Sequence, residues 1–517
     1  MFNFSLSLPM LQGVFDNPLG RYFLSFNIFF QSYILKIVAV IALIFFLRMA
    51  FVFLTNQKKW QKKKNFFSDL TIEEVKNLAQ KKGLSLPSFT VLIPAREEAL
   101  VIKSTLFRIA QINYPLDKME IVVITDEKER QKRVNNQPIT QEEVENAIKE
   151  LTKEKKGLKI HHLEIPYDYD GELFGRQLFK EVPSTKGRAL NYALTSFHSS
   201  DFCAFFDTDD YPHQNCLLSV AYEYLKDNKK VLFQMPIFQC RNFFSISTFS
   251  KIISLGQAFT HEYFLPWILT WLPFLGGTNF FVKTNYLIQA GGFRLDSITE
   301  DLELGTRLYL KENIWPIFLP LASSEQTPPN FKSYFHQRQR WGLGQMKVLA
   351  DLSQMVKDPN ENPEIKTKAR QLYYKLIAYG PLEWLIYFAI TALSSFSLII
   401  SFIRVLLVVS FLNTFYSASF LMIGKEFLNS LFSIISFPLL IMTALLFFHY
   451  RSYITKPKIS WQLAGNIGKT LLEMFFIIPF VLFLYPLPFV SAFFKHFIRK
   501  QKEPLWVKTP RTAEAIK

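Results

Sequence analysis

The sequence predicts an α/β domain with a doubly wound sheet, set between membrane-spanning helices. Between about Leu86 and Ala350, short apolar runs alternate with helical stretches, as in α/β proteins. Long apolar runs flank that region, and a chain that is 49% hydrophobic and 16% aromatic is unusually apolar for a soluble protein. We divide the chain into residues 1–60 (leader and membrane anchor), 61–350 (the α/β domain), 351–500 (C-terminal membrane and interface helices) and 501–517 (a basic tail).

Four runs rich in β-branched or aromatic residues predict the strands of the sheet. Their nearly continuous apolar character is what a parallel sheet covered on both faces requires. The runs are Ser88–Ile93, Glu120–Thr125, Leu158–Ile165 and Phe202–Phe206.

Helices are expected between these strands. Thr71 with Glu74, and Thr140 with Glu143, have the spacing of a capping box, which marks a helix start. Lys186–Phe197 places its apolar residues on one helical face. A doubly wound sheet of this kind binds its ligand outside the carboxyl ends of the strands.

Tyr33–Leu54 is about as long as a helix that crosses a hydrocarbon core of roughly 30 Å. No small-residue cleavage site follows it, so we interpret it as a retained anchor rather than a signal peptide. The lysine-rich stretch 56–64 comes next, and basic flanks stay on the cytoplasmic side. We therefore expect a cytoplasmic domain on a plasma or inner membrane.

The C-terminal third predicts three or four further crossings, over Trp384–Ile403 with its continuation, Ser430–Tyr450 and Leu471–Phe494. Basic residues follow two of them, at 451–458 and 495–502. Both basic stretches favour the cytoplasmic side, so the sequence leaves the topology of this end open.

The formal net charge of +16 suits a protein that lies on anionic lipid or takes an anionic substrate such as a sugar nucleotide. Nucleic-acid binding is disfavoured because no basic, aromatic-interleaved module is present and much of the excess charge flanks apolar runs. Cys203, Cys216 and Cys240 lack metal-site or redox spacing, and we expect them to be reduced.

Polar residues follow three of the predicted strands, in "IPAREE" (93–98), "ITDEKE" (124–129) and "FFDTDD" (205–210). Asp207 and Asp209 alone have two interpretations. Aspartates are common in turns, where they cap N–H groups. Two carboxylates on alternate residues can also meet one hard cation together with diphosphate oxygens.

Two later motifs decide between these interpretations: "ITEDLELGTR" at 298–307 and "HQRQRW" at 336–341. With "FFDTDD", "STKGRALNYAL" (184–194) and "FLGGTNFFV" (274–282), the chain resembles the processive, membrane-integrated family 2 glycosyltransferases, the group of cellulose, chitin and hyaluronan synthases. The resemblance covers about Leu86 to Ala350 and implies a cytoplasmic GT-A domain.

The resemblance implies an inverting transfer from a nucleotide-diphospho-sugar donor to a growing β-linked glycan. Asp209, with Asp207, would hold Mg²⁺ or Mn²⁺. Asp301, next to Glu300, would be the general base, although an acid at a helix N-terminus can simply stabilise the helix dipole. Asp210 is expected to cap the helix that follows.

The resemblance also implies the other site residues. Either Asp126 or Glu127 would contact the base of the donor, and Asp126 is our choice. The full donor set is Pro94, Ala95, Glu98, Asp126, Lys186, Asp207, Asp209 and Arg340. The acceptor set is Gly277, Thr278, Thr299, Gln337 and Trp341.

Three functions follow from these observations: a polymerising and exporting glycosyltransferase, an enzyme that transfers a single sugar to a lipid, or a non-catalytic membrane scaffold. Intact carboxylates argue against the scaffold. Phe238–Pro273 is expected to be either an amphipathic segment on the membrane or core. The tail Glu503–Thr512 is expected to return to the cytoplasmic face as an amphipathic or gating element.

Overall fold

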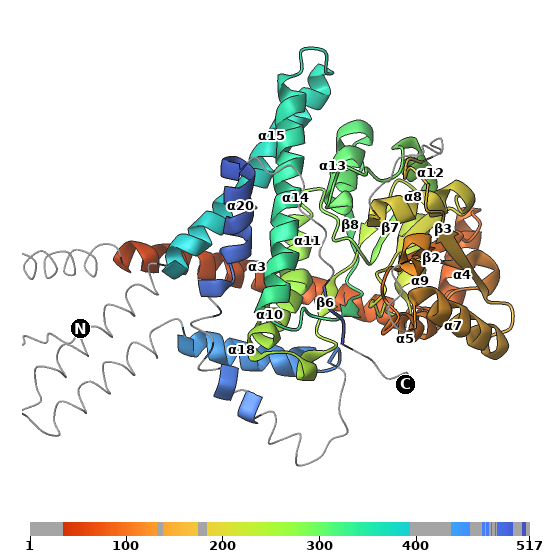
Figure 1. The fold of residues 1–517 in the computed structure, drawn as a ribbon, viewed down its shortest axis with the longest axis horizontal. Helices are drawn as coiled ribbons and strands as arrows, with labels where there is room; N and C mark the ends of the chain where they lie inside the picture. The colour runs from red at the N-terminus through yellow and green to blue at the C-terminus, as the bar shows by residue number, and fades with distance from the viewer. Residues whose placement is uncertain are drawn as a thin grey trace, which may run out of the picture.

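A computed structural model of the chain describes residues 35–131, 138–173, 184–392, 436–454, most of 468–499, and 509–512 (Figure 1). Its centre is a seven-stranded sheet in the order β3-β2-β1-β4-β7-β5-β8. A separate two-stranded sheet pairs β6 with β9. The strands are β1 Phe89–Pro94, β2 Met119–Asp126, β3 Lys159–Ile165, β4 Phe202–Phe205, β5 Leu232–Gln234, β6 Ile237–Gln239, β7 Phe280–Lys283, β8 Ile317–Phe318 and β9 Ser323–Glu325.

The four predicted strands are confirmed to within one residue at each end and pair in parallel as β3-β2-β1-β4. The rest of the sheet was not predicted. β7 runs antiparallel to both β4 and β5. Because β7 immediately follows the "FLGGTN" segment, this reversal delivers that segment to the carboxyl end of β4.

The helices connect the strands and extend beyond them. They are α3 Leu35–Asp69, α4 Ile72–Lys82, α5 Ile102–Ile109, α6 Glu127–Arg130, α7 Thr140–Glu154, α8 Lys186–Ser196, α9 Cys216–Lys226, α10 Thr248–Phe259, the π-helix η4 Thr260–Phe264, α11 Leu265–Ile268, α12 Thr284–Gln289, α13 Glu300–Glu312, α14 Phe331–Lys357, α15 Pro363–Ala378, α18 Ser436–Tyr450 and α20 Leu487–Arg499. Short 3-10 turns lie at Leu116–Lys118 and Phe243–Ser245.

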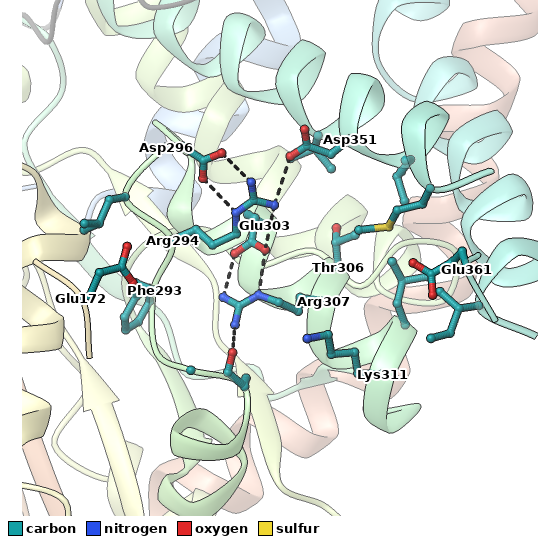
Figure 2. Close-up of a pocket in the computed structure, with 18 residues that line it drawn as sticks. Glu172, Phe293, Arg294, Asp296, Glu303, Thr306, Arg307, Lys311, Asp351 and Glu361 are labelled. Atoms are coloured by element: carbon teal, nitrogen blue, oxygen red, sulfur yellow. Dashed lines mark hydrogen bonds and ion pairs between the residues drawn. The ribbon is translucent and has the colours of Figure 1, made fainter. Parts of the chain in front are cut away.

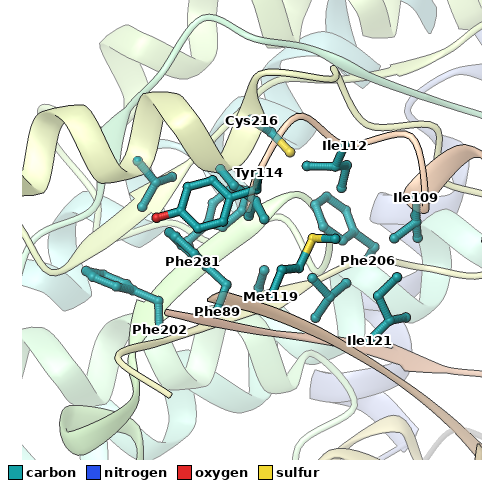
Figure 3. Close-up of a cluster of buried hydrophobic side chains, with 14 of the residues drawn as sticks. Phe89, Ile109, Ile112, Tyr114, Met119, Ile121, Phe202, Phe206, Cys216 and Phe281 are labelled. Carbon is teal, nitrogen blue, oxygen red and sulfur yellow. The ribbon is translucent and has the colours of Figure 1, made fainter. Parts of the chain in front are cut away.

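Both faces of the sheet are buried, as a doubly wound fold requires. Phe89, Phe202 and Phe206 belong to one core, which packs under α4, α5, α7 and α9 (Figure 3). Leu92 and Cys203 belong to the other core, under α8, α12 and α13. Alternate residues of each strand therefore enter opposite cores, and the carboxyl ends of the strands are left as the rim on which a site can form.

One of the two predicted capping boxes is confirmed. Thr71 accepts from the Glu74 backbone N–H, and the Glu74 carboxylate accepts from the Thr71 N–H. The prediction at Thr140 was wrong. Thr140 is already the first helical residue of α7, and its hydroxyl binds Glu129 and the backbone N–H of Glu98 instead. The Thr140 hydroxyl therefore hydrogen-bonds to residues outside α7 and does not cap the helix.

The three cysteines are buried free thiols, in agreement with the prediction. Burial raises the pKa of Cys203 to about 12, and the pKa values of Cys216 and Cys240 are raised for the same reason. Phe238–Pro273, predicted as either core or amphipathic, contributes buried residues such as Phe243 and Leu255 to a core shared with α18.

Beside the sheet domain, α14, α15 and α20 stand together, and α18 lies under α10 (Figure 1). Within the described residues, no helix combines the length and the apolar character that crossing a membrane demands. Of the first predicted span, residues 35–54 lie in α3. The other three fall wholly or partly outside the described residues.

Candidate functional site

The polar residues predicted to bind the donor gather at the carboxyl edge of the sheet. Pro94 ends β1, Asp126 ends β2, and Asp207 and Asp209 follow β4. Lys186 is the first residue of α8. Adjacent parallel strands bring these positions together although they lie far apart in the sequence.

Lys186 connects the turn after β4 to the segment that precedes β7. Its ammonium group donates to the Asp207 carboxylate and, at 2.6 Å, to the carbonyl of Gly277. Burial favours the neutral amine, but the charges of Asp207 and Glu300 more than offset it, so the pKa of Lys186 is raised. Lys186 is therefore a fixed cation between the turn that holds Asp207 and the "TED" segment, Thr299–Asp301.

Gly277 brings the backbone against the predicted base. Its φ is +83°, a conformation open to glycine but unfavourable for other residues. A Cβ atom there would lie 3.0 Å from Asp301 Oδ2, so a side chain would press on the carboxylate. The interpretation of Gly277 as an acceptor-site residue remains a prediction.

Glu300 and Asp301 form the first turn of α13, directly after Thr299. Burial, with the charge of Glu300, raises the pKa of Asp301 to about 7. Burial also raises the pKa of Glu300. A carboxylate with a pKa near neutrality is suited to accept a proton at physiological pH.

Thr278 organises the "DTDD" turn. Its hydroxyl accepts from the Asp207 backbone N–H at 3.0 Å and donates to Asp210 Oδ2 at 2.5 Å. Asp210 was predicted to cap the following helix, and this is wrong. Helix α9 begins only at Cys216, with Asn215 at its N-cap position, and Asp210 binds Thr278 instead.

Burial raises the pKa of Asp210 to about 7. Asp210 is completely buried, so it is a structural support beneath the turn rather than a group exposed to substrate.

Helix α14 presents the "QRQRW" motif to the same region. Arg340 donates to the carbonyl of Ile298 at 3.3 Å, just before Thr299. Gly344 permits the close approach, since a Cβ at that position would lie 2.3 Å from the Thr299 methyl group. The motif helix thus packs directly on the segment that holds Asp301.

Gln337 and Trp341, the predicted acceptor residues, lie on the same helix. Gln337 is buried, and its Oε1 atom has no hydrogen-bond partner among the described residues. Trp341 is half-buried, with the Arg338 guanidinium 3.8 Å from the centre of its ring. Their acceptor roles stay predictions.

Asp126 is engaged by a residue that the sequence analysis did not single out. Its Oδ2 atom accepts from Arg188 Nη1 at 3.0 Å, and both side chains are buried. Arg188 also donates to the carbonyls of Pro166 and Tyr169. The Glu127 carboxylate accepts from the backbone N–H of Tyr167. The structure thus leaves open which of the two acids contacts a base.

Ala95 and Glu98 lie in the loop after β1. Ala95 is buried, and its N–H donates to the carbonyl of Ile124. Glu98 Oε2 forms an ion pair with Arg511 Nε, from the C-terminal tail, at 3.3 Å. The same arginine reaches Asp209 Oδ2 at 2.7 Å.

Asp207 and Asp209, the predicted metal ligands, have the chemistry that a hard divalent cation requires. Asp207 and Asp209 supply oxygen ligands, and Glu325, next to Asp209's partner Gln326, has a buried Oε1 atom with no hydrogen-bond partner among the described residues. Burial raises the pKa of Glu325 well above its usual range, and the three aspartates add to this effect. No group of three or more acidic, histidine or cysteine side chains in the described parts is arranged as a metal site. Oxygen ligands are those that Mg²⁺ and Mn²⁺ prefer.

A cavity of about 510 Å³ lies on another face of α13 (Figure 2). It is lined by Glu303, Thr306 and Arg307 of α13 and by Asp351 of α14. Arg294 pairs there with Asp296 and Asp351. None of the predicted site residues is among the described side chains that line this cavity.

Sequence reasoning missed Arg188, Glu325, Gln326 and Arg511 as contributors to the site. Arg188 lies inside a quoted motif, "TKGRALN", but only its burial against Asp126 shows its partner. Gln326 and Arg511 are brought to Asp209 from distant parts of the chain, and no local spacing indicates such contacts.

Comparisons with known proteins show the family of the chain. The model of "Glycosyl transferase family group 2" matches residues 204–490, more than half of the chain. The probable glycosyltransferase YdaM of Bacillus subtilis is 24% identical over 285 residues, which cover 53% of this chain and 59% of that protein. The probable glucomannan 4-beta-mannosyltransferase 2 of Oryza sativa is 24% identical over 52% of this chain and 42% of its own length.

A beta-monoglucosyldiacylglycerol synthase of Trichormus variabilis is 25% identical, with 53% of this chain and 52% of that protein covered. The chain thus spans about half the length of these curated relatives. Among solved structures, the mannosyltransferase PcManGT of Pyrobaculum calidifontis, in complex with GDP-Man and Mn²⁺, is 16% identical with a TM-score of 0.39 over 77% of this chain and 95% of that one. On the family match, this chain belongs to glycosyl transferase family group 2.

Proposed function

We propose that the protein is a metal-dependent, inverting glycosyltransferase that extends a β-linked polysaccharide from a nucleotide-diphospho-sugar, with a UDP-sugar as the first donor to test. The observation that carries the proposal is the convergence on Lys186. One ammonium group donates to Asp207 of the proposed donor turn and to the Gly277 carbonyl, and a Cβ atom added at Gly277 would lie 3.0 Å from Asp301 Oδ2. The proposed donor carboxylate and the proposed base therefore lie close to the same pair of residues, Lys186 and Gly277.

In the proposed reaction, Asp301 takes the proton of the acceptor hydroxyl while that oxygen attacks the anomeric carbon. The new carbon–oxygen bond forms on the face opposite the nucleotide, and the bond to the diphosphate breaks with its electron pair. Inversion by one displacement needs one base and no covalent intermediate. When bound, Mg²⁺ or Mn²⁺ would neutralise charge on the diphosphate, held by Asp209 and Asp207. Lys186 provides a second, fixed positive charge.

The acceptor is proposed to lie along α14, near Gln337, Trp341 and Thr299. One observation supports this placement: the buried Oε1 atom of Gln337 has no hydrogen-bond partner among the described residues. The Arg338 guanidinium covers one face of the Trp341 ring, and a sugar is proposed to stack on the other face. Asp301 lies at the start of the helix on which α14 packs. An acceptor bound there would have its terminal hydroxyl near the base.

A membrane location and export of the product are part of the same proposal. Exposed apolar residues recur at helical spacing along α3, at Val40, Ile44, Leu47, Phe51 and Leu54. Phe494 and Phe497 of α20 are also exposed. Such a face suits contact with lipid. Extraction of native membranes with carbonate tests the location: retention in the pellet supports an integral protein, and release into the supernatant contradicts it.

Transfer of a single sugar to a lipid is the second candidate. It is favoured by the similarity to a beta-monoglucosyldiacylglycerol synthase, which matches about as much of this chain as the glucomannan relative does. The same donor chemistry serves both, so the acceptor decides between them.

One experiment separates the candidates. Membranes containing the full chain are incubated with a panel of UDP- and GDP-sugars plus Mg²⁺ or Mn²⁺, and nucleotide release and product length are measured. A ladder of lengthening products supports the polysaccharide. A product that stops at one sugar on lipid supports the alternative, and an absence of turnover with every donor contradicts both.

A further inference from the structure

The cavity of about 510 Å³ between α13, α14 and α15 has no part in the proposed sugar transfer (Figure 2). None of the residues assigned to the donor, the metal or the acceptor is among the described side chains that line it. Sites for small molecules usually have volumes of about 300–1,000 Å³, so this cavity is large enough for a ligand of its own.

Part of the cavity wall is aliphatic. Leu310 of α13, Leu352 and Met355 of α14 and Ile365 of α15 contribute to it. Phe293 is the single aromatic side chain among the described residues of the lining. Aliphatic side chains remove methylene groups from water, whereas sugar rings and bases stack on flat aromatic faces. The wall therefore favours a ligand with a methylene chain over a sugar or a nucleotide.

The charged residues of the lining favour a cationic ligand. The described acids outnumber the described bases: the acids are Glu172, Asp296, Glu303, Asp351 and Glu361, and the bases are Arg294, Arg307 and Lys311. Both arginines are already paired. Arg294 binds Asp296 and Asp351, and Arg307 Nε lies 2.8 Å from Glu303 Oε1. An anionic ligand would therefore find both guanidinium groups engaged, and only the exposed Lys311 would be left to bind it.

Two of the acids, Glu172 and Glu361, are left for a ligand. In the part of the chain that the structure describes, neither is within ion-pair distance of a basic side chain, and Glu361 Oε1 accepts only the backbone N–H of Asn362, at 3.0 Å. Figure 2 shows the two acids on opposite sides of the cavity. Two separated carboxylates match a ligand with ammonium groups at both ends of a chain.

A buried hydroxyl provides a second, independent observation. Thr306 lines the cavity between the two acids (Figure 2), and its side chain is 6% exposed. Its Oγ1 atom has no hydrogen-bond partner among the described residues. A threonine within a helix can bond to a carbonyl one turn earlier, but this one does not. An unsatisfied buried hydroxyl is costly, and an amine N–H of a ligand would satisfy it as a donor.

The helix ends at the cavity have the same preference. Leu310 and Lys311 belong to the last turn of α13, and Met355 belongs to the last turn of α14. The carboxyl end of a helix carries a partial negative charge, which attracts cations. Ile365 lies in the first turn of α15, where the partial charge is positive. Two helix ends therefore favour a cation and one opposes it.

We propose that this cavity is a binding site for a linear polyamine, a chain of methylene groups with ammonium groups at both ends. The terminal ammonium groups bind Glu172 and Glu361, an amine N–H donates to Thr306 Oγ1, and the methylene groups pack on the aliphatic wall. The bound ligand contacts α13, α14 and α15 at once. The proposal goes beyond the proposed function and does not depend on the donor chemistry.

The first test is isothermal titration calorimetry of the full-length, detergent-solubilised protein with spermidine. A chain with a formal net charge of +16 repels cations in general, so saturable one-to-one binding would report a local site. Hexylamine has a methylene chain but a single ammonium group, and it should bind about fivefold more weakly or worse. Glucose and inorganic pyrophosphate, which represent the polyol and anionic alternatives, should not bind.

The second test changes the proposed contacts one at a time. Glu172→Gln and Glu361→Gln should each weaken spermidine binding about fivefold, the upper range for a solvent-accessible ion pair. Thr306→Val keeps the shape of the side chain and should weaken binding by a similar factor. Glu312→Gln is the matched control, because Glu312 is an exposed acid at the end of α13 that does not line the cavity. Its affinity should equal that of wild type.

The outcomes decide the proposal without a measurement of sugar transfer. One-to-one binding of spermidine that is lost in the double variant Glu172→Gln, Glu361→Gln and kept in Glu312→Gln supports the polyamine site. Equal affinity of the double variant and wild type would overturn it, as would the absence of saturable binding. Binding of hexylamine as tight as that of spermidine, or binding of glucose or pyrophosphate in its place, would overturn the assignment of a polyamine.

Discussion

Gly344→Ala is a sensitive test of how α14 is seated on the "TED" segment. The added Cβ would lie 2.3 Å from the Thr299 methyl carbon and 2.4 Å from its hydroxyl oxygen. Carbon atoms in contact sit roughly 3.5–4.0 Å apart, so the helix and the loop must separate by about 1 Å or more. Thr299 directly precedes Glu300 and Asp301, so the displacement falls on the proposed base.

Two opposing effects of Gly344→Ala act on the free energy of unfolding, whereas its effect on turnover is only a loss. Alanine in a helix interior is more favourable than glycine by about 1 kcal/mol. Overpacking costs about 1–3 kcal/mol, so the free energy of unfolding should fall by up to about 2 kcal/mol. Displacing a catalytic group by about 1 Å can lower turnover about 100-fold.

Gly256→Ala is the matched control. It is also a glycine within a helix, but nothing lies within 4 Å of its added Cβ. This variant should gain about 0.5–1 kcal/mol of stability and keep wild-type turnover. Urea unfolding and nucleotide release are measured on both proteins. If Gly344→Ala were as stable and as active as Gly256→Ala, the packing of α14 on Thr299 would be refuted.

Four further predictions follow from individual contacts. Because burial raises the pKa of Asp301 to about 7, nucleotide release should increase as the pH is raised through 7, when the base ionises; a rate that is flat from pH 5.5 to 8 would contradict this. The raised pKa of Asp301 also makes the free energy of unfolding depend on pH. The neutral carboxyl stabilises the folded state fully below about pH 4, and this stabilisation is lost as the pH rises through about 7. The free energy of unfolding should therefore fall less over that range in Asp301→Asn than in wild type. Arg188→Met leaves Asp126 buried without its partner and should cost about 3–5 kcal/mol in urea unfolding, whereas Arg130→Met, from a surface pair, should cost at most about 1 kcal/mol; equal losses would contradict the account. Thr278→Val removes the hydroxyl that joins Asp207 and Asp210, so it should destabilise the protein by about 1–3 kcal/mol and weaken UDP binding in calorimetry, with Thr284→Val as the comparison that leaves UDP binding unchanged.

The parts of the fold that the sequence predicted correctly are those with strong local signals. β1, β2 and β4 are buried along almost their whole length, so they are apolar and easy to recognise. The edge strand β3 is only partly buried and carries polar residues among its apolar ones. β5, β7 and β8 are two to four residues long, and their partners in the sheet are distant in sequence. Such short strands have no period of their own, and tertiary pairing decides their direction.

The same distinction holds in the site. Asp207, Asp209 and Asp301 belong to motifs whose order along the chain could be recognised, and the structure brings the segments together through Lys186. Asp210 and Thr140 were misassigned because each side chain has two possible partners, a nearby helix end and a polar group distant in sequence. In each case the side chain hydrogen-bonds to the distant group. Arg511 docks on Asp209 through three-dimensional proximity alone.

The most direct test of the central claim is nucleoside diphosphate release by the full-length protein with a nucleotide sugar, an acceptor and Mn²⁺, compared between wild type and Asp301→Asn. The account predicts turnover by wild type and a loss of about 100-fold or more in Asp301→Asn, with the variant folded and still binding the donor. Asp351→Asn, an acid of the separate cavity, should retain wild-type turnover. Equal rates for wild type and Asp301→Asn would contradict the assignment of Asp301 as the base.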